Sequence, residues 1–121
     1  MRERRFADAR QVLEQFLSLV PAGGGREQTA LYDLAVVCEQ LNDAGCVRES
    51  LERHLLRHPV GPLREDVRIR LCRFLERTGS PSDLASCLLD YLAEFPEGRK
   101  AQWAREVLGG PAPGPPDGDG V

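Results

Sequence analysis

The amino-acid sequence predicts an all-α protein in which five or six helices form a short solenoid of antiparallel hairpins. Three segments repeat one pattern, in which the end of an amphipathic helix is followed by a proline, one residue and a glycine. These segments are LERHLLRHPVG (51–61), LLDYLAEFPEG (88–98) and, more faintly, LEQFLSLVPAG (13–23). No segment alternates apolar and polar residues as a strand does. Helical repeats of this kind are typical of solenoids, in which each unit covers the apolar face of its neighbour.

Each helix is predicted by apolar residues that recur at intervals of three or four. Such intervals run through residues 6–20, 31–41, 47–58, 67–75, 84–95 and 103–108. The second helix is expected to end at the segment 42–45, and the third and fifth at Pro59 and Pro96. Residues 80–83 (Ser-Pro-Ser-Asp) are of the types that start a helix, so they are expected to open the fifth.

Length and composition indicate one domain, residues 1–108, followed by a tail. The chain has 121 residues and a formal net charge of −3, from 16 basic and 19 acidic side chains. This balance argues against a nucleic-acid partner, for which a basic stripe is expected. Direct membrane insertion is not expected, because no apolar run approaches the roughly 20 residues of a membrane span. Segment 21–25 is expected to be a flexible linker, and the Gly/Pro-rich segment 109–121 a disordered tail.

The repeat can be aligned position by position across the middle of the chain. Three positions recur after 34 residues, which pairs Cys38 with Cys72, Leu41 with Leu75 and Gly45 with Gly79. A unit therefore comprises a helix, a glycine turn, a second helix and a proline–glycine exit. The chain holds half a unit, two full units and one closing helix. Trp103, in the closing helix, is expected to cover the open end of the array.

This repeat length resembles that of tetratricopeptide repeats. The resemblance covers roughly residues 6–108. In the first full unit, the residues at signature positions are Leu31, Leu34, Ala35, Leu51 and Pro59. The second unit departs from the pattern, because Glu65 and Arg68 stand where large apolar residues are usual. The resemblance implies a right-handed solenoid that binds a protein or a peptide.

A narrower resemblance concerns location. The segments 30–35, 51–71 and 88–98 are similar to repeat domains of bacterial envelope proteins. Those proteins include transmembrane anti-sigma regulators of GC-rich bacteria and periplasmic helpers of cell division or outer-membrane assembly. The resemblance implies a periplasmic or cell-envelope location, with the cytoplasm as the alternative.

In tetratricopeptide arrays, the first helix of each unit lines a concave groove. By that resemblance, eight side chains would form a partner-binding groove: Tyr32, Val36, Glu39, Gln40, Asp66, Arg70, Arg73 and Phe74. Arg70 and Arg73 can pair with a peptide carboxylate, because guanidinium groups suit that geometry. Tyr32 and Phe74 can supply aromatic anchors. The alternative is that the charged residues are ordinary surface, and that Val36 and Phe74 belong to the core.

The four cysteines are the strongest chemical feature of the sequence. Cys38 and Cys46 stand on opposite sides of the first hairpin turn, and Cys72 and Cys87 do so in the second. Their even number and their positions favour one disulfide inside each hairpin, although four cysteines allow three pairings. The alternative is that all four are reduced and buried as small apolar residues.

His54 and His58 are four residues apart on one helix and form a usable pair of metal ligands. Cys46 lies two turns earlier, roughly 12 Å away, which is too far for it to share one ion with them. The two histidines also align with Tyr91 and Phe95 of the next unit, which are packing positions. We therefore interpret both histidines as packing residues and expect neither a metal nor a cofactor.

Catalytic motifs are not recognisable in the sequence. Gly23-Gly24-Gly25 is not a phosphate-binding loop, because the lysine and hydroxyl residue that complete such a loop do not follow it. With both histidines assigned to packing, few candidates remain for a nucleophile and its base. The sequence therefore predicts a non-enzymatic scaffold that binds a protein or a peptide. The alternative is a structural module that associates with itself by stacking through its end helices.

Overall fold

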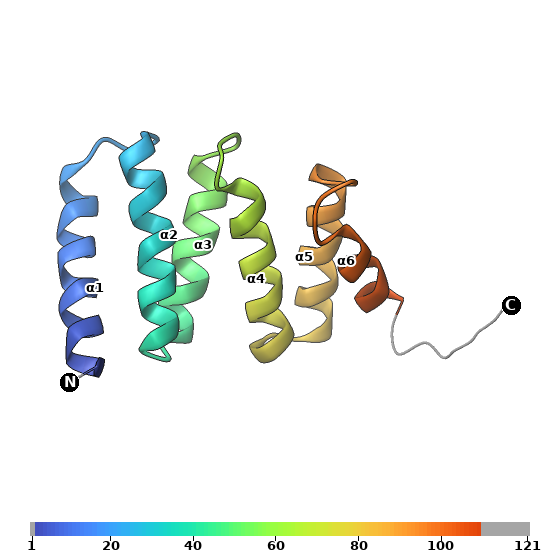
Figure 1. Ribbon diagram of the computed structural model, residues 1–121, viewed down its shortest axis with the longest axis horizontal. Helices are drawn as coiled ribbons and strands as arrows, with labels where there is room; N and C mark the ends of the chain where they lie inside the picture. Colours follow the sequence, from blue (N-terminus) through green and yellow to red (C-terminus); the bar gives the residue numbers. More distant parts are fainter. Residues whose placement is uncertain (1, 110–121) are drawn as a thin grey trace, which may run out of the picture.

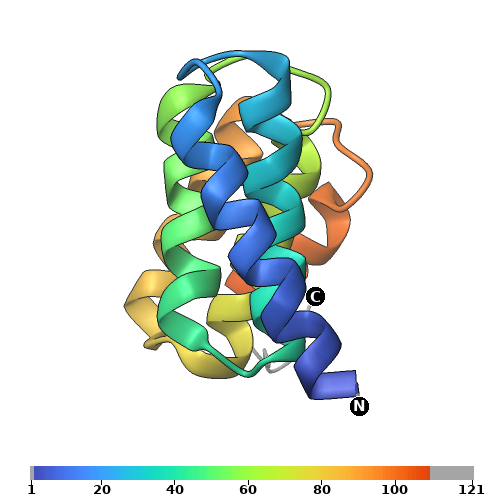
Figure 2. The same ribbon diagram turned by 90° about the vertical axis from the view of Figure 1, so that its left-hand side faces the viewer.

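A computed structural model describes residues 2–109, and within this range the chain forms six α-helices and no strand. The helices are α1 (Arg2–Leu19), α2 (Gly25–Gln40), α3 (Ala44–Arg57), α4 (Arg64–Thr78), α5 (Pro81–Glu94) and α6 (Ala101–Leu108). Each helix packs against the next one along the chain, so the helices stand in a row from α1 to α6 (Figure 1). The perpendicular view places α3 on one side of the row and α2 and α6 on the other (Figure 2). The prediction of an all-α protein with five or six helices is confirmed.

The apolar core runs along the whole row. Four fully buried residues come from successive helices: Leu31 from α2, Leu51 from α3, Val67 from α4 and Leu88 from α5. Burial of such apolar sides is the main source of helix stability in a protein of this kind. Of the helices between residues 2 and 109, none has an apolar stretch that would reach across a bilayer. The predicted disordered tail, 109–121, lies outside the described residues except for Gly109.

Side-chain caps fix the starts of two helices. Asp43 accepts a hydrogen bond from the Cys46 backbone N–H (3.1 Å) at the start of α3. Ser80 accepts one from the Asp83 backbone N–H (3.1 Å) at the start of α5. Pro81 follows Ser80 at the first helical position, where a backbone N–H has no intrahelical partner in any case. The helix start predicted at residues 80–83 is confirmed.

The start of α2 differs from the prediction, because the helix begins at Gly25, inside the expected linker 21–25. Glu27 explains this early start. Its carboxylate, which is almost fully buried, accepts a hydrogen bond from the Gly23 backbone N–H (2.7 Å) and forms an ion pair with Arg57 (2.6 Å). Burial raises the pKa of Glu27, but the Gly23 hydrogen bond and the Arg57 guanidinium outweigh it and lower the pKa below its usual value. These contacts bind the start of α2 to the end of α3.

The two histidines occupy different environments, although both are buried. His54 is fully buried, and neither of its ring nitrogens has a hydrogen-bond partner among the described residues. The His58 Nε2 lies 3.0 Å from Oε1 of Glu27, the oxygen that also accepts from the Gly23 backbone N–H, and its ring centre lies 5.0 Å from that of His54. His54 is therefore a packing residue, whereas His58 also belongs to the polar cluster around Glu27. Within residues 2–109, no group of three or more His, Cys, Asp and Glu side chains is placed to hold a metal ion.

The structure pairs the four cysteines as one disulfide in each hairpin. Cys38 of α2 is bonded to Cys46 of α3, with their Cα atoms 5.9 Å apart. Cys72 of α4 is bonded to Cys87 of α5, with their Cα atoms 5.5 Å apart. All four residues are buried, so each bond lies inside the core between the two helices that it joins. The pairing within hairpins is confirmed.

The repeated proline–x–glycine exits have a steric reason at both strong copies. A Cβ atom on Gly61 would collide with the Gln28 side chain, and one on Gly98 would collide with the Tyr91 hydroxyl and the Glu65 carboxylate. Each glycine thus lets the connecting segment approach a neighbouring helix closely. The repeated glycine therefore marks a tight passage of the backbone at the end of each hairpin.

The disulfides predict a measurable loss of stability on their removal. We expect the double substitution Cys72→Ala with Cys87→Ala to lower the free energy of unfolding by about 3 kcal/mol, because the bond closes a separation of 15 residues. Urea denaturation followed by circular dichroism measures this change. An unchanged midpoint, or four alkylatable thiols in the denatured and unreduced protein, would contradict the pairing.

Burial of His54 predicts a loss of stability in mild acid. Burial lowers the pKa of His54 from 6.5 to about 4, so below pH 6.5 the unfolded chain binds a proton that the folded protein does not. We expect the free energy of unfolding to fall by about 2 kcal/mol more in the parent protein than in His54→Leu between pH 7.5 and pH 5. Urea denaturation at both pH values compares the two proteins. Parallel pH dependences would show that His54 is accessible to protons in the folded state.

Candidate functional site

A hollow of about 240 Å³ opens on the face formed by α2, α4 and the segment that precedes α6. Its lining residues are Tyr32, Glu39, Asp66, Ile69, Arg70, Arg73, Arg77 and Arg99. Four guanidinium groups face two carboxylates there, so the lining carries two positive charges in excess, although the whole chain is acidic. We call this site the arginine hollow.

The structure brings together five of the eight residues of the expected groove in this hollow: Tyr32, Glu39, Asp66, Arg70 and Arg73. The other three lie elsewhere. Val36 is half-buried and Gln40 is exposed on α2, and neither lines the hollow. Phe74 is buried and lines a separate hollow between α3 and the C-terminal end of α4.

Arg70 connects α4 to α2 through two residues. Its guanidinium forms an ion pair with Glu39 and donates a hydrogen bond to the Tyr32 hydroxyl (3.3 Å). The guanidinium carbon also lies 5.2 Å from the centre of the Tyr32 ring. Burial lowers the pKa of Arg70, but the Tyr32 hydrogen bond and the Glu39 charge together raise it above its usual value. Arg70 is therefore held in place as a permanent positive charge.

Arg73 and Arg77 are both exposed, and within residues 2–109 neither forms an ion pair with a carboxylate. They are four residues apart, so they are neighbours on one side of α4. The Arg73 guanidinium lies over the Trp103 ring of α6, 4.6 Å from its centre. This cation–π contact orients Arg73 without using its N–H groups, which stay available for an anion. The half-buried Trp103 thus lies beside the hollow, at the closing helix where the sequence places it.

Three residues of the hollow are absent from the predicted groove: the buried Ile69 and the two arginines Arg77 and Arg99. Arg77 could have been found, because it follows Arg73 by one helical turn. Arg99 lies in the segment between α5 and α6, where no periodicity indicates its direction. It enters the hollow because its guanidinium pairs with Asp66 and its backbone N–H donates to Glu65 (3.0 Å).

The position of α4 is fixed by Arg64, at its first residue. The Arg64 guanidinium donates to the backbone oxygens of Leu55 (2.8 Å) and His58 (2.9 Å), and it forms a two-bonded ion pair with Glu94 of α5 (2.6 and 2.7 Å). Arg68 donates to the same carboxylate (2.6 Å). The Arg64 hydrogen bonds are the main reason why the pKa of Glu94 is lowered to about 2.

The two residues of the second unit that depart from the tetratricopeptide pattern are both paired with α5. Glu65 accepts a hydrogen bond from the buried Tyr91 hydroxyl (2.9 Å), which itself accepts one from the Lys100 backbone N–H (3.0 Å). Arg68 pairs with Glu94. Polar side chains therefore replace apolar packing at this helix contact and leave their polar groups satisfied.

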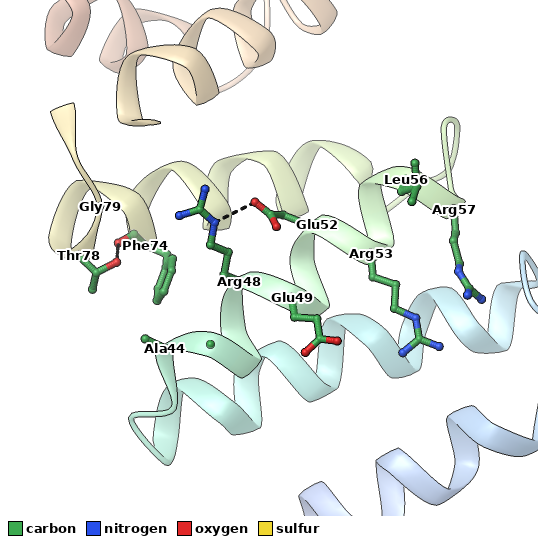
Figure 3. Close-up of a pocket in the computed structure, with 11 residues that line it drawn as sticks. Ala44, Arg48, Glu49, Glu52, Arg53, Leu56, Arg57, Phe74, Thr78 and Gly79 are labelled. Carbon is green, nitrogen blue, oxygen red and sulfur yellow. Dashed lines mark hydrogen bonds and ion pairs between the residues drawn. The ribbon is translucent and has the colours of Figure 1, made fainter. Parts of the chain in front are cut away.

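A larger hollow, of about 670 Å³, lies between α3 and the end of α4 (Figure 3). Its charged residues all come from α3, and two of its three arginines, Arg48 and Arg57, are paired with carboxylates. Arg48 pairs with Glu52 (2.9 Å), as Figure 3 shows, and also with Asp83 (3.5 Å). Arg57 pairs with the buried Glu27. As a candidate binding site, this hollow is favoured by its size. The arginine hollow is favoured by Arg73 and Arg77, two exposed arginines that pair with no carboxylate among the described residues.

Comparison with known proteins adds no relative, since no family model matches the chain and no curated protein matches it. A fold of this kind would not in any case define a function by itself. A function for the arginine hollow has to be argued from the chemistry of its own side chains, which are guanidinium groups beside aromatic rings.

The clamp formed by Arg64 and Glu94 predicts a stability difference that depends on pH. The folded-state pKa of Glu94 is lowered from 4.5 to about 2, so the carboxylate stabilises the fold above pH 4.5 and loses this effect as the pH falls toward 2. We expect Glu94→Gln to lower the free energy of unfolding by about 1–2 kcal/mol at pH 7, a value reduced for partial solvent exposure.

The matched control for this substitution is Glu97→Gln. Glu97 is exposed just after α5 and forms no ion pair with the residues that the structure describes. Urea denaturation at pH 7 and at pH 2.5–4.5 compares the variants, and the deficit of Glu94→Gln is expected to shrink across the acid range. Equal stability of both variants and the parent at pH 7 would contradict the clamp.

Proposed function

We propose that the protein is a non-enzymatic scaffold that binds an acidic segment of a partner protein or peptide in the arginine hollow. The pair Arg73 and Arg77 is the observation that carries this proposal. Both side chains are exposed neighbours on α4, and no carboxylate among residues 2–109 neutralises them. A guanidinium presents its N–H donors in a planar fork that matches the two oxygens of a carboxylate.

Aromatic side chains support binding of a peptide rather than of a free ion alone. Tyr32 and Trp103 are half-buried and lie on the two sides of the arginine pair, on α2 and α6. Each is held by an arginine over its ring, so each presents a rigid surface to a ligand. Rigid aromatic groups beside arginines are typical of residues that dominate binding energy at interfaces.

The proposal includes a tetratricopeptide-like arrangement, in which the hairpins form a short right-handed solenoid. Two features support it. Successive helices pack in chain order, and α2 and α4, the first helices of the two full units, both line the arginine hollow. This is the face that the resemblance assigns to partner binding.

The proposal also includes an oxidising compartment, of which the bacterial periplasm is the leading candidate. All four cysteines of the chain are paired in two disulfides. Stable disulfides form in extracellular and periplasmic compartments and are rare in the cytosol of most cells. This supports a role in the cell envelope.

The test uses Trp103, the only tryptophan of the chain, as a reporter of binding. We expect a tetraglutamate peptide to change the fluorescence of Trp103 with saturation, because it competes for Arg73 beside the indole ring. The double substitution Arg73→Ala with Arg77→Ala is expected to weaken binding at least about tenfold, which corresponds to the loss of about 1.4 kcal/mol.

Two controls separate recognition from general charge attraction. Arg4→Ala with Arg5→Ala removes the same charge from exposed positions of α1 and should leave the affinity unchanged. A tetraglutamine peptide, similar in size but uncharged, should not bind. Equal loss of affinity in the two arginine variants, or no saturable binding, would contradict the proposal.

A further inference from the structure

The outer side of α1 carries apolar side chains that the described part of the chain leaves uncovered. Val12 is 62% exposed, Phe16 37% and Leu19 82%. Their spacing of four and three residues places them along one side of the helix. The other side of α1 carries the buried Leu17, and Leu13, which lies between the two sides, is partly buried against the core. This helix therefore has two apolar sides, and only one of them is covered.

A groove of about 570 Å³ continues this uncovered side between α1 and α2. From α1 it is lined by Val12, Leu13 and Phe16, and from α2 by Gly25, Arg26, Thr29, Ala30 and Asp33. The α2 residues after Gly25 are spaced as one side of a helix. The two middle residues of this set, Thr29 and Ala30, have small side chains and leave room for the backbone of a neighbouring helix to approach.

Charges flank the middle of this α2 side symmetrically. Arg26 and Asp33 are both exposed, and neither forms an ion pair with any residue that the structure describes. They are seven residues apart, which is roughly 10 Å along a helix. Thr29 and Ala30 lie midway between them. This side of α2 therefore has small side chains at its centre, the exposed Thr29 and the buried Ala30, with a positive charge at one end and a negative charge at the other.

We infer that this groove is the interface of a twofold-symmetric dimer, and that its occupant is a second copy of the chain. A twofold axis through the middle of the α2 side, at Thr29 and Ala30, reverses the direction of the partner helix. It thus places Arg26 of each copy opposite Asp33 of the other. Such an interface is self-complementary, as closed dimers require. The exposed apolar side chains of α1 are covered in the same contact, which supplies the driving force.

The charge pattern is the reason for choosing a second copy over another protein. A foreign helix needs its own matching charges, whereas the antiparallel copy carries them at the required separation. This inference is independent of the proposed function. The groove is lined by α1 and α2, the helices at one end of the row (Figure 1), and it shares no residue with the arginine hollow.

Charge reversal tests this arrangement with the full chain in sedimentation equilibrium. The parent protein is expected to be a dimer at micromolar concentration. Arg26→Asp places two aspartates opposite each other at both ends of the interface, and Asp33→Arg places two arginines there. We expect each single variant to dissociate at least about tenfold more readily than the parent, because like charges at an interface are repulsive.

Two combinations of these substitutions, a double variant and a mixture of the single variants, restore attraction only in the twofold arrangement. The double variant Arg26→Asp with Asp33→Arg recreates opposite charges across the interface and should dimerise as the parent does. An equimolar mixture of the two single variants should form a heterodimer, because one copy carries both aspartates and the other both arginines. Two controls should leave dimerisation unchanged: Leu89→Ser at an exposed apolar residue of α5, and Glu76→Arg at an exposed residue of α4.

The outcomes are decisive in both directions. Weakened single variants together with a restored double variant and a heterodimer support the inference. A parent protein that stays monomeric throughout the micromolar range overturns it, and then another protein or another segment covers the groove. A dimer that is insensitive to both single substitutions, or a double variant that stays as weak as the single ones, also overturns it.

Discussion

The position of α4 depends on one guanidinium, that of Arg64. The last carbonyl groups of a helix lack hydrogen-bond partners within the helix. Arg64 donates hydrogen bonds to two such carbonyl groups at the end of α3, and it also binds Glu94 of α5. One side chain therefore satisfies the end of the preceding helix and clamps the following one. Five of the eight residues that line the arginine hollow come from α4. The geometry of the hollow, and with it the proposed recognition of acidic peptides, depends on this clamp.

The row of helices is held together by both covalent and polar contacts. The disulfides act inside the hairpins, joining α2 to α3 and α4 to α5. Charged pairs act inside a hairpin and beyond it. Glu27 of α2 binds Arg57 at the end of α3, within one hairpin, whereas Arg10 of α1 binds Asp43 in the turn after α2 (2.7 Å). Since a buried carboxylate such as Glu27 is costly without its partners, these pairs fix the register of neighbouring helices as well as joining them.

Local patterns made the helices and the disulfides predictable from the sequence, because both depend on spacing along the chain. The two cysteine pairs are separated by only 8 and 15 residues. The contacts of Glu27 with Arg57 and of Arg99 with Asp66 join residues 30 or more apart and follow no period. Five of the eight residues of the hollow were predicted, because the resemblance to tetratricopeptide repeats assigns the first helix of each unit to one face. Phe74 is buried in the core, as the alternative interpretation expected, because one residue along a helix turns a side chain by about 100° away from Arg73.

Arginine side-chain NMR tests the central claim most directly, since it observes each guanidinium during a titration with an acidic peptide. We predict that the Nε–Hε signals of Arg73 and Arg77 shift together and saturate, because both bind the same carboxylate-rich segment. The signals of Arg4 and Arg5, exposed on α1, should remain in place. Small, unsaturable shifts of equal size at all exposed arginines would show general charge attraction, and would contradict a specific binding site in the arginine hollow.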